Sequence, residues 1–261
     1  MLRFVINLDS SPERLAGISE RLNELGIPFE RIPAINGLAL SDEQVAALTY
    51  PLDHFESRIR FPRELSKGEI GCFLSHRMCW QRLLESKDDW ALIMEDDIRI
   101  SSLAPKYMLS ADWVPRDVHV CQYSWSKAEQ KGRILKEPLG IDDALQIVIP
   151  VFPSPMGCMC YLISRTFAEA AVRRSEKFAA PVDVFLFSRW FDLAREFIVW
   201  RTSPTLVTHN EKMHSVIGQR SGSSLKKAPF WIRHGLSRFL LGLQIKNHRK
   251  KGVDFTFVFK E

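Results

Sequence analysis

The chain has 261 residues, of which 46% are hydrophobic and 26% charged, with only 13 Gly and 14 Pro. This length and composition are typical of one large α/β domain or two small ones, and they exclude a disordered, collagen-like or small scaffold protein. The net charge of +5 is unevenly distributed. Residues 212–251 contain ten Lys or Arg and no acid, so the other residues together carry a net charge of −5. This distribution argues against a protein that coats nucleic acid over its whole surface.

The N-terminal part of the chain is predicted to be a strand-helix-strand unit. Residues 2–8 form a short apolar run of the buried type, and the turn at 9–12 ends in a Pro suited to the first position of a helix. Leu and Ile recur at three- and four-residue spacing from 15 to 25, and Gly26 ends this helix before a second strand at 28–32. Such a unit predicts parallel pairing of its strands.

Helices and strands are predicted to alternate through the middle of the chain. A short helix at 42–48 precedes a long one at 66–86, where Ser66 and Glu69 are spaced as a capping box. The next strand, at 90–94, stops at three consecutive acids. Further strands are predicted at 118–123, 145–151, 159–163, 197–200 and 205–207, and helices after Ser164 and around 182–194. The alternation predicts an α/β fold whose open, mainly parallel sheet is flanked by helices and binds ligands beyond the carboxyl ends of its strands.

The C-terminal stretch is predicted to contain a basic amphipathic helix. Apolar residues fall at helical spacing between 230 and 245, and the basic residues around them are Lys226, Lys227, Arg233, Arg238, Lys246, Arg249, Lys250 and Lys251. This pattern predicts a helix that lies on an anionic membrane surface. The alternative is a helix whose apolar face packs on the rest of the protein. We divide the chain into a main domain at 1–220 and a basic segment at 221–261.

Targeting signals and disulfides are not expected. The first strand begins directly after Met1, which leaves no room for a signal peptide, and no apolar run approaches about 18 residues. The five cysteines lack a second Cys or Cys/His pair that would complete a four-ligand set, so buried thiols in a reducing cytosol are favoured over disulfides or a zinc site. The sequence predicts a soluble or peripheral protein.

The three acids Glu95, Asp96 and Asp97 need a physical explanation. Because side chains alternate along a strand, Glu95 and Asp97 are expected on one side and Asp96 on the other. Carboxylates beside a buried strand repel one another, and a hard divalent ion such as Mg²⁺ or Mn²⁺ removes this conflict by binding their oxygens. A solvated acidic turn or a helix cap is the alternative interpretation.

Ordered motifs along the chain place these acids in a wider pattern. The motifs are VINLDSSPERL at 5–15, AINGL at 34–38, LSKGEIGCFLSH at 65–76, LIMEDDI at 92–98, MGCMCYLISR at 156–165, PVDVFLF at 181–187 and SPTLV at 203–207. In this order they resemble glycosyltransferase family 25, the lipopolysaccharide-biosynthesis galactosyltransferase group. The resemblance implies a GT-A-like, metal-dependent transferase that moves a hexose from a nucleotide diphosphate sugar with inversion at the anomeric carbon.

The resemblance also implies the metal ligands. Asp97 would bind Mn²⁺ or Mg²⁺, Glu95 would bind the metal or the donor ribose, and Asp96 is the alternative ligand. The ion would neutralise the charge that builds on the leaving nucleoside diphosphate. A late histidine supplies a further ligand, which is His209 here, with His214 as the alternative; because glutamine is frequent at this place in the family, a phosphate contact or a surface position for His209 stays open.

Inverting transfer needs a base that takes the proton from the attacking hydroxyl. Asp183, in the matched segment 181–187, is the predicted base. The alternative is an acid in the first turn of a helix, where the helix dipole favours negative charge. Asp142 and Asp143, in a loop of unassigned structure, are further candidates.

A donor-binding set completes the implied site. It consists of Asn7, Arg14, Asn36, Gly37, Ser75, His76 and Gly157. Asn7 and Arg14 flank the first strand-to-helix turn, where backbone amides and a guanidinium suit a nucleotide. The alternatives are a surface pair of Arg14 with Glu13, and a buried His76 that supports its neighbours.

The predicted function is transfer of a hexose, galactose in the first instance, from a UDP-sugar to a lipid-linked oligosaccharide such as the core of lipopolysaccharide. The protein would be cytoplasmic and peripheral on the inner face of the bacterial inner membrane, and its partners would be the donor, the acceptor and anionic lipid, with no nucleic acid. Alternatives are transfer of glucose or another hexose, a metal-dependent nucleotide phosphohydrolase, for which no Walker-type glycine loop is present, and a non-catalytic membrane-binding protein.

Overall fold

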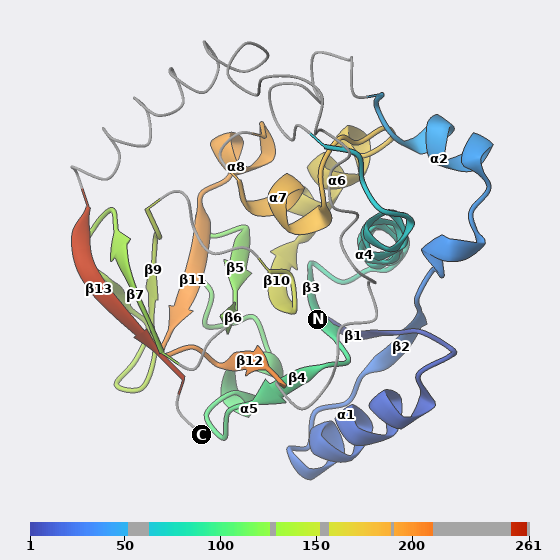
Figure 1. The fold of residues 1–261 in the computed structure, drawn as a ribbon. Helices are drawn as coiled ribbons and strands as arrows, with labels where there is room; N and C mark the ends of the chain where they lie inside the picture. The colour runs from blue at the N-terminus through green and yellow to red at the C-terminus, as the bar shows by residue number, and fades with distance from the viewer. Residues whose placement is uncertain (52–62, 126–128, 152–156, 189–190, 211–251, 260–261) are drawn as a thin grey trace.

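The structure is a computed structural model, and it describes residues 1–51, 63–125, 129–151, 157–188, 191–210 and 252–259 (Figure 1). The elements of the first half are β1 (Leu2–Asn7), α1 (Pro12–Glu24), β2 (Glu30–Pro33), the 3₁₀ turn η1 (Gly37–Ala39), α2 (Asp42–Leu48), α4 (Lys67–Glu85), β3 (Trp90–Glu95), β4 (Ile98–Ile100), α5 (Pro105–Met108), β5 (Val120–Gln122) and β6 (Ser124–Trp125). Those of the second half are β7 (Glu129–Ile134), β8 (Leu139–Gly140), β9 (Gln146–Val148), β10 (Cys160–Ser164), α6 (Arg165–Arg174), α7 (Val182–Phe187), α8 (Leu193–Glu196), β11 (Val199–Ser203), β12 (Val207–His209) and β13 (Val253–Val258).

An eight-stranded sheet runs through the centre of the protein in the order β2-β1-β3-β10-β5-β11-β9-β8 (Figure 1). β1 pairs in parallel with β2 and β3, as the strand-helix-strand pattern predicts, and β5 pairs in parallel with β11. β10 runs antiparallel to β3 and β5, and β9 runs antiparallel to β11 and β8. The α/β class with an open sheet flanked by helices is confirmed, but the sheet is mixed rather than mainly parallel. An apolar run such as 159–163 is compatible with either strand direction when both faces are covered.

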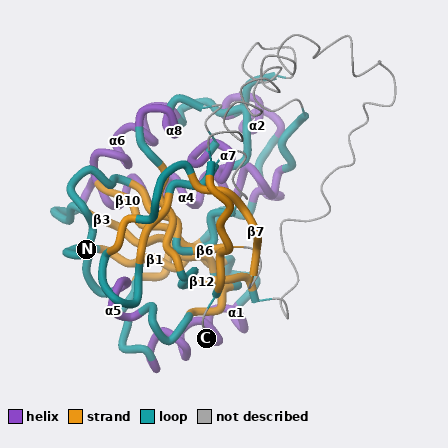
Figure 2. Tube along the Cα trace, turned by 90° about the vertical axis from the view of Figure 1, so that its left-hand side faces the viewer, coloured by secondary structure: helices purple, strands orange, loops and turns teal. Residues whose placement is uncertain are grey.

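Helices cover both faces of this sheet (Figure 2). On one face Phe4 and Ile93 pack with residues of α4, α6 and α7, and on the other Val5 and Leu92 pack with residues of α1 and α5. Successive side chains of a strand point to opposite faces, so every residue of β1 and β3 that lies inside the sheet meets an apolar layer. This two-sided burial explains why these strands are continuous apolar runs in the sequence.

Several predicted elements differ in extent from those observed, including the strands predicted at 145–151 and 197–200, which are β9 and β11. The helix predicted around 182–194 is two short helices, α7 and α8, and the strand predicted at 205–207 begins at Val207 and continues to His209. All residues of α7 except Asp183 are buried, so this segment has no polar face whose periodicity would mark where the helix ends.

The end of the chain returns to the body of the protein. β13 pairs antiparallel with β7 along its whole length, and Phe257 stacks on Trp125 with ring centroids 4.2 Å apart. The sequence analysis missed this strand pair. The predicted basic amphipathic helix with its eight basic residues, and His214, lie outside the described residues, so the division at residue 220 stays a prediction. Within the described ranges, no helix is long and apolar enough to cross a membrane.

Glycine allows the loop after β2 to lie directly against α4. A Cβ atom added at Gly71 would lie 2.5 Å from the carbonyl oxygen of Ile35 and 2.6 Å from the backbone nitrogen of Gly37. One added at Gly37 would lie 1.7 Å from the carbonyl oxygen of Lys67. These neighbours are backbone atoms, which cannot rotate away as a flexible side chain can. Gly37 is therefore required for packing, independently of any ligand.

We expect Gly71→Ala to destabilise the protein by about 2 to 4 kcal/mol, because the loop must move away from α4. Urea unfolding followed by circular dichroism would measure the change. Gly17→Ala is the matched control, since a Cβ atom at this position of α1 meets no atom within 4 Å, and Ala should stabilise that helix slightly. Equal unfolding midpoints for Gly71→Ala and the wild type would contradict the close contact.

Candidate active site

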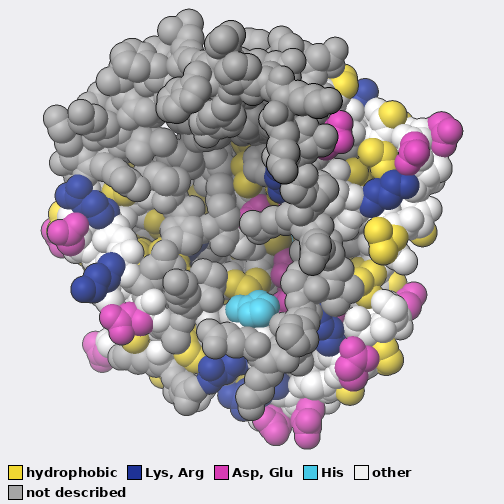
Figure 3. All heavy atoms as spheres, in the orientation of Figure 1, with side chains coloured by type: hydrophobic (Ala, Val, Ile, Leu, Met, Phe, Trp, Pro, Cys, Tyr) yellow, Lys and Arg dark blue, Asp and Glu magenta, His cyan; other side chains and the backbone are white. Residues whose placement is uncertain are grey.

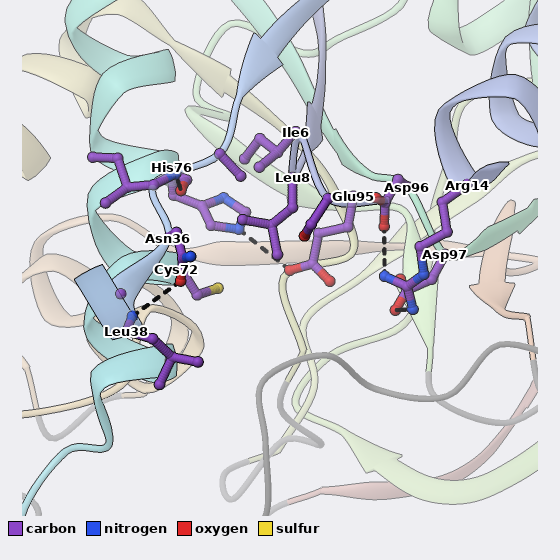
Figure 4. A pocket seen from close by; sticks show the side chains of 16 residues that line it. Ile6, Leu8, Arg14, Asn36, Leu38, Cys72, His76, Glu95, Asp96 and Asp97 are labelled. Carbon is purple, nitrogen blue, oxygen red and sulfur yellow. Dashed lines mark hydrogen bonds and ion pairs between the residues drawn. The ribbon is translucent and has the colours of Figure 1, made fainter. Parts of the chain in front are cut away.

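A pocket of about 250 Å³ opens at the carboxyl ends of the parallel strands β1, β2 and β3, beside α4 (Figure 4). This is the place where open α/β sheets bind ligands. In the space-filling view a histidine and acidic side chains are visible in a hollow of the protein face (Figure 3). The predicted site residues that line the pocket are Arg14, Asn36, Gly37, Ser75, His76, Glu95, Asp96 and Asp97.

The predicted alternation, with Glu95 and Asp97 on one side and Asp96 on the other, is wrong, because β3 ends at Glu95 and the two aspartates follow it in a bend. Asp96 accepts a hydrogen bond from Asn7 Nδ2 at 2.7 Å and one from Arg14 Nη1 at 2.9 Å. Asp97 Oδ2 lies 3.6 Å from Arg14 Nη2 and 3.6 Å from His209 Nε2. Glu95 turns the other way, toward α4, and its Oε1 lies 3.3 Å from His76 Nε2. Asp97 is thus the acid that faces His209, the histidine predicted to be its fellow metal ligand.

Asp97 carries an incompletely compensated charge. Its Oδ1 atom is buried and has no hydrogen-bond partner among the described residues. Burial and the nearby charge of Glu95 raise the pKa of Asp97 to about 6, although His209 and Arg14 oppose this shift. Burial also raises the pKa of Asp96, against the effect of Asn7 and Arg14. A divalent cation would satisfy the unpartnered oxygen, so the residues present fit a hard metal ion.

Asn7 and Arg14 hold the acids in place. Asn7 is buried, its side-chain amide donates to Asp96 and to the carbonyl oxygen of Ser11, and its Oδ1 accepts from Arg31 Nε at 3.1 Å. Asn7 does not line the pocket, whereas Arg14 does. This geometry makes Asn7 a positioning residue for Asp96, and direct contact of either residue with a nucleotide stays a prediction.

His76 is fully buried at the pocket floor and bridges two parts of the protein. Its Nδ1 lies 2.9 Å from the Tyr161 hydroxyl, and its Nε2 faces Glu95 and Cys158 Sγ, the latter at 3.4 Å. Although burial alone lowers the pKa of an imidazole, contacts with Cys72 and Glu95 raise the pKa of His76 to about 9. Burial alone would raise the pKa of Glu95, but His76 and Cys158 bring it below the usual range. Glu95 is consequently ionised.

Sequence reasoning missed two cysteines beside His76, of which only Cys72 lines the pocket. Cys72 lines the pocket one turn before His76 on α4, and Cys158 Sγ lies 3.0 Å from Glu95 Oε1. Ligand atoms of Cys72, His76, Glu95 and Cys158 all lie within 4.8 Å of one another. The thiols are free, as expected, but the expectation that the cysteines lack a four-ligand set is wrong. The i, i+4 spacing of Cys72 and His76 was the available signal.

The remaining predicted donor residues shape the pocket wall. Ser75 Oγ accepts from the backbone nitrogen of Ile35 at 2.8 Å and thereby ties α4 to the loop after β2. Asn36 Oδ1 accepts from the backbone nitrogen of Leu38 at 3.1 Å (Figure 4) and caps η1. Gly157 has a φ of +139°, which favours glycine, and it directly precedes Cys158, but it does not line the pocket. Their contacts with a donor stay predictions.

The candidate bases occupy different environments. Asp183 lies in the first turn of α7, where its Oδ1 accepts from the backbone nitrogen of Val184 at 2.8 Å. Burial, and to a lesser extent the charge of Glu95, raises the pKa of Asp183, which does not line the strand-end pocket. Asp142 instead accepts hydrogen bonds from Lys106 and Tyr107, and with Asp143 it lines a second pocket beside β13.

Comparisons with known proteins give the same class as the motifs. A putative glycosyltransferase of Haemophilus influenzae is 27% identical over 81% of this chain and 71% of its own length. The lacto-N-neotetraose biosynthesis glycosyltransferase LgtB of Neisseria meningitidis is 27% identical over 74% of this chain and 70% of its own. Human procollagen galactosyltransferase 2 is 32% identical over 41% of this chain, which spans only 17% of that longer protein.

Solved structures give weaker similarities. A glycosyltransferase involved in glycosylation of the major capsid of PBCV-1 covers 92% of this chain with 8% identity and a TM-score of 0.41, and its own chain is covered completely. The galactosyltransferase LgtC covers 80% of this chain, and 86% of its own, with 11% identity and a TM-score of 0.36.

Residues 1–186 match the model of glycosyltransferase family 25 (LPS biosynthesis protein), and the chain belongs to this family. The matched range contains β1, β2, β3 and α4 and every residue that lines the pocket, whereas His209 lies outside the matched range. The protein is accordingly a glycosyltransferase by family, and the acid cluster at 95–97 lies in the part of the chain that the family defines.

Proposed function

We propose that the protein transfers a hexose, galactose in the first instance, from a UDP-sugar to an oligosaccharide acceptor of lipopolysaccharide or lipooligosaccharide, with inversion at the anomeric carbon. The observation that carries the proposal is Asp97, whose buried Oδ1 has no hydrogen-bond partner among the described residues and which lies beside Glu95 and His209 in the strand-end pocket. The printed names of the relatives, a lacto-N-neotetraose biosynthesis glycosyltransferase and a procollagen galactosyltransferase, support galactose and an oligosaccharide acceptor.

Asp97 and His209, whose Oδ2 and Nε2 atoms lie 3.6 Å apart, are the residues that would hold a divalent metal ion, Mn²⁺ or Mg²⁺. Glu95, the further ligand implied by the resemblance, turns toward His76 instead. When bound, the ion supplies positive charge that stabilises the leaving nucleoside diphosphate. Arg14, paired with Asp96, adds a guanidinium at the pocket wall that suits a phosphate. The exposed Leu38 and the buried Ile6 give the pocket apolar surface for the rest of the donor.

Asp183 is the proposed base. In a single displacement the acceptor hydroxyl oxygen bonds to the anomeric carbon as the bond to the diphosphate oxygen breaks, and the hydroxyl proton passes to the base. Because burial raises the pKa of Asp183, its carboxylate is a better proton acceptor than that of an exposed aspartate. The carboxylate then releases this proton to solvent before the next turnover.

The test is a donor panel. Purified protein with Mn²⁺ is incubated with UDP-galactose, UDP-glucose and other nucleotide sugars, and nucleoside diphosphate release is measured with and without a truncated lipooligosaccharide. We expect UDP release that depends on the acceptor and is fastest with UDP-galactose. Faster release from UDP-glucose would make the protein a glucosyltransferase. Release of inorganic phosphate would favour the phosphohydrolase, and no release with any donor would overturn the transferase proposal.

We also propose that residues 226–251 attract the protein to anionic membranes through their eight basic side chains. The protein should sediment with vesicles that contain phosphatidylglycerol at low salt and be released at high salt. Truncation before residue 252 would also remove β13, which pairs with β7, so substitution is the cleaner experiment. Arg249→Gln, Lys250→Gln and Lys251→Gln together should weaken sedimentation without changing turnover of a soluble acceptor. Unchanged sedimentation would contradict the role of these charges.

A further inference from the structure

Four side chains from three separate elements converge on one point behind the acid cluster. Cys72 and His76 lie one turn apart on α4, Glu95 ends β3, and Cys158 precedes β10, which pairs antiparallel with β3. Their candidate ligand atoms lie within 4.8 Å of one another. We propose that Cys72 Sγ, His76 Nε2, Glu95 Oε1 and Cys158 Sγ form a binding site for Zn²⁺, distinct from the oxygen-rich side where Asp97 meets His209.

The distances suit tetrahedral coordination. With metal–nitrogen and metal–oxygen bonds of about 2.0 to 2.1 Å and metal–sulfur bonds of about 2.3 Å, neighbouring ligand atoms of a tetrahedron are about 3.3 to 3.8 Å apart. His76 Nε2 lies 3.3 Å from Glu95 Oε1 and 3.4 Å from Cys158 Sγ. Cys158 Sγ lies 3.0 Å from Glu95 Oε1, so this pair would separate slightly around an ion.

The contacts of His76 leave the correct nitrogen for a metal. The Tyr161 hydroxyl accepts a hydrogen bond from Trp80 Nε1 at 3.0 Å and lies 2.9 Å from His76 Nδ1. The hydroxyl oxygen has a second lone pair for the Nδ1 proton, and the Nε2 lone pair then faces the cluster. Metal-binding histidines are commonly oriented in this way through their other nitrogen. The ring is fully buried, so its orientation is fixed by packing.

The chemistry of the ligands selects the kind of ion. Two thiols, an imidazole and one carboxylate prefer Zn²⁺ or another thiophilic ion, whereas Mg²⁺ and Mn²⁺ prefer sets made of oxygen atoms. Three of the ligands lie on α4 and β3, which are core elements, and Cys158 is a buried residue two positions before β10, so the fold itself holds the four ligands. The proposal does not depend on the proposed transferase activity.

Metal binding can be measured directly on the full chain. Protein purified under reducing conditions and freed of metal is titrated with Zn²⁺ against a chromophoric chelator, and in parallel with Co²⁺. We expect one Zn²⁺ per chain, and a Co²⁺ complex with the thiolate-to-metal charge-transfer absorption and intense visible bands of a tetrahedral thiolate site. Absence of the charge-transfer band in the wild type would overturn the proposal without recourse to variants.

Matched variants locate the ion. Cys72→Ser and Cys158→Ser should each weaken Zn²⁺ binding at least about 100-fold. Cys79→Ser on α4 and Cys160→Ser on β10 are the controls, because both thiols are buried on the same elements outside the cluster, and these variants should bind as the wild type does. Circular dichroism checks that each variant is folded.

Asp97→Asn separates this site from the proposed donor metal site. The variant should keep wild-type affinity for Zn²⁺ because Asp97 is not one of the four ligands. Loss of Zn²⁺ binding in Asp97→Asn, together with unchanged binding in Cys72→Ser and Cys158→Ser, would place the ion on the carboxylates and refute the thiol site. Failure of sugar transfer with intact Zn²⁺ binding would refute the proposed function alone.

Discussion

Asp97→Asn is expected to lower kcat/KM for sugar transfer at least about 1000-fold, because the substitution removes a charge and a ligand from the proposed metal site. The measurement is UDP release at saturating acceptor over a range of Mn²⁺ concentrations. Mn²⁺ should raise the melting temperature of the wild type and leave that of the variant unchanged. Both results follow if the buried Oδ1 atom of Asp97 binds the ion.

Stability in the absence of metal distinguishes this explanation from misfolding. Burial and Glu95 raise the pKa of Asp97 to about 6, so the ionised form that prevails at pH 7 costs the folded protein stability relative to the unfolded chain. A neutral amide at this position should therefore not lower the melting temperature of the metal-free chain. Asp117→Asn, at an exposed position, is the control and should retain full activity. Wild-type turnover in Asp97→Asn would remove Asp97 from the metal site.

Asp183→Asn should reduce kcat about 100- to 10,000-fold while the KM for the donor changes little, since a base acts in the chemical step rather than in donor binding. The raised pKa of Asp183 gives the sign of the pH dependence: the carboxylate is active when ionised, so kcat/KM of the wild type should rise with pH through a value above that of an exposed aspartate. The residual activity of Asp183→Asn should not show this rise with pH.

Mn²⁺-induced stabilisation should survive in Asp183→Asn, which separates loss of the base from loss of the metal. Asp143→Asn is the comparison variant, because Asp143 was a candidate base from sequence but lines a different pocket. Its activity should stay within a few-fold of the wild type. Loss of activity in Asp143→Asn with normal kcat in Asp183→Asn would reverse the assignment.

Local patterns in the sequence predicted the part of the fold that forms the pocket. The β1-α1-β2 unit, the capped helix α4 and the acids that end β3 each depend on periodicity and caps within a short segment. Parallel pairing of β1 with β2 and β3 then brings three carboxyl ends to one edge, as the strand-helix-strand rule requires. The proximity of His209 to Asp97 was also predicted, from the resemblance to glycosyltransferase family 25 and not from periodicity or capping.

The unpredicted features are contacts between distant segments. Cys158 meets Cys72 and Glu95 only because β10 is reversed beside β3, and an apolar run carries no signal of strand direction. β13 pairs with β7, although more than a hundred residues separate them in the chain, and no local pattern in either segment predicts its partner. The structure also shows that the Asn7 amide donates to Asp96, a partner that could not be predicted, since sequence shows which groups are polar but not which neighbours satisfy them.

The strand β13 gives the basic stretch a topology that a free tail would not have. The backbone nitrogen of Asn210 donates to the carbonyl oxygen of Asp97 at 2.8 Å, and the chain is fixed again where β13 pairs with β7, so residues 211–251 are joined to the protein at both ends. Residue 231 is 21 residues from either 210 or 252, a contour of at most about 75 Å. If residues 211–251 bind a membrane surface, that surface is connected through Asn210 to the backbone of Asp97, the candidate metal ligand.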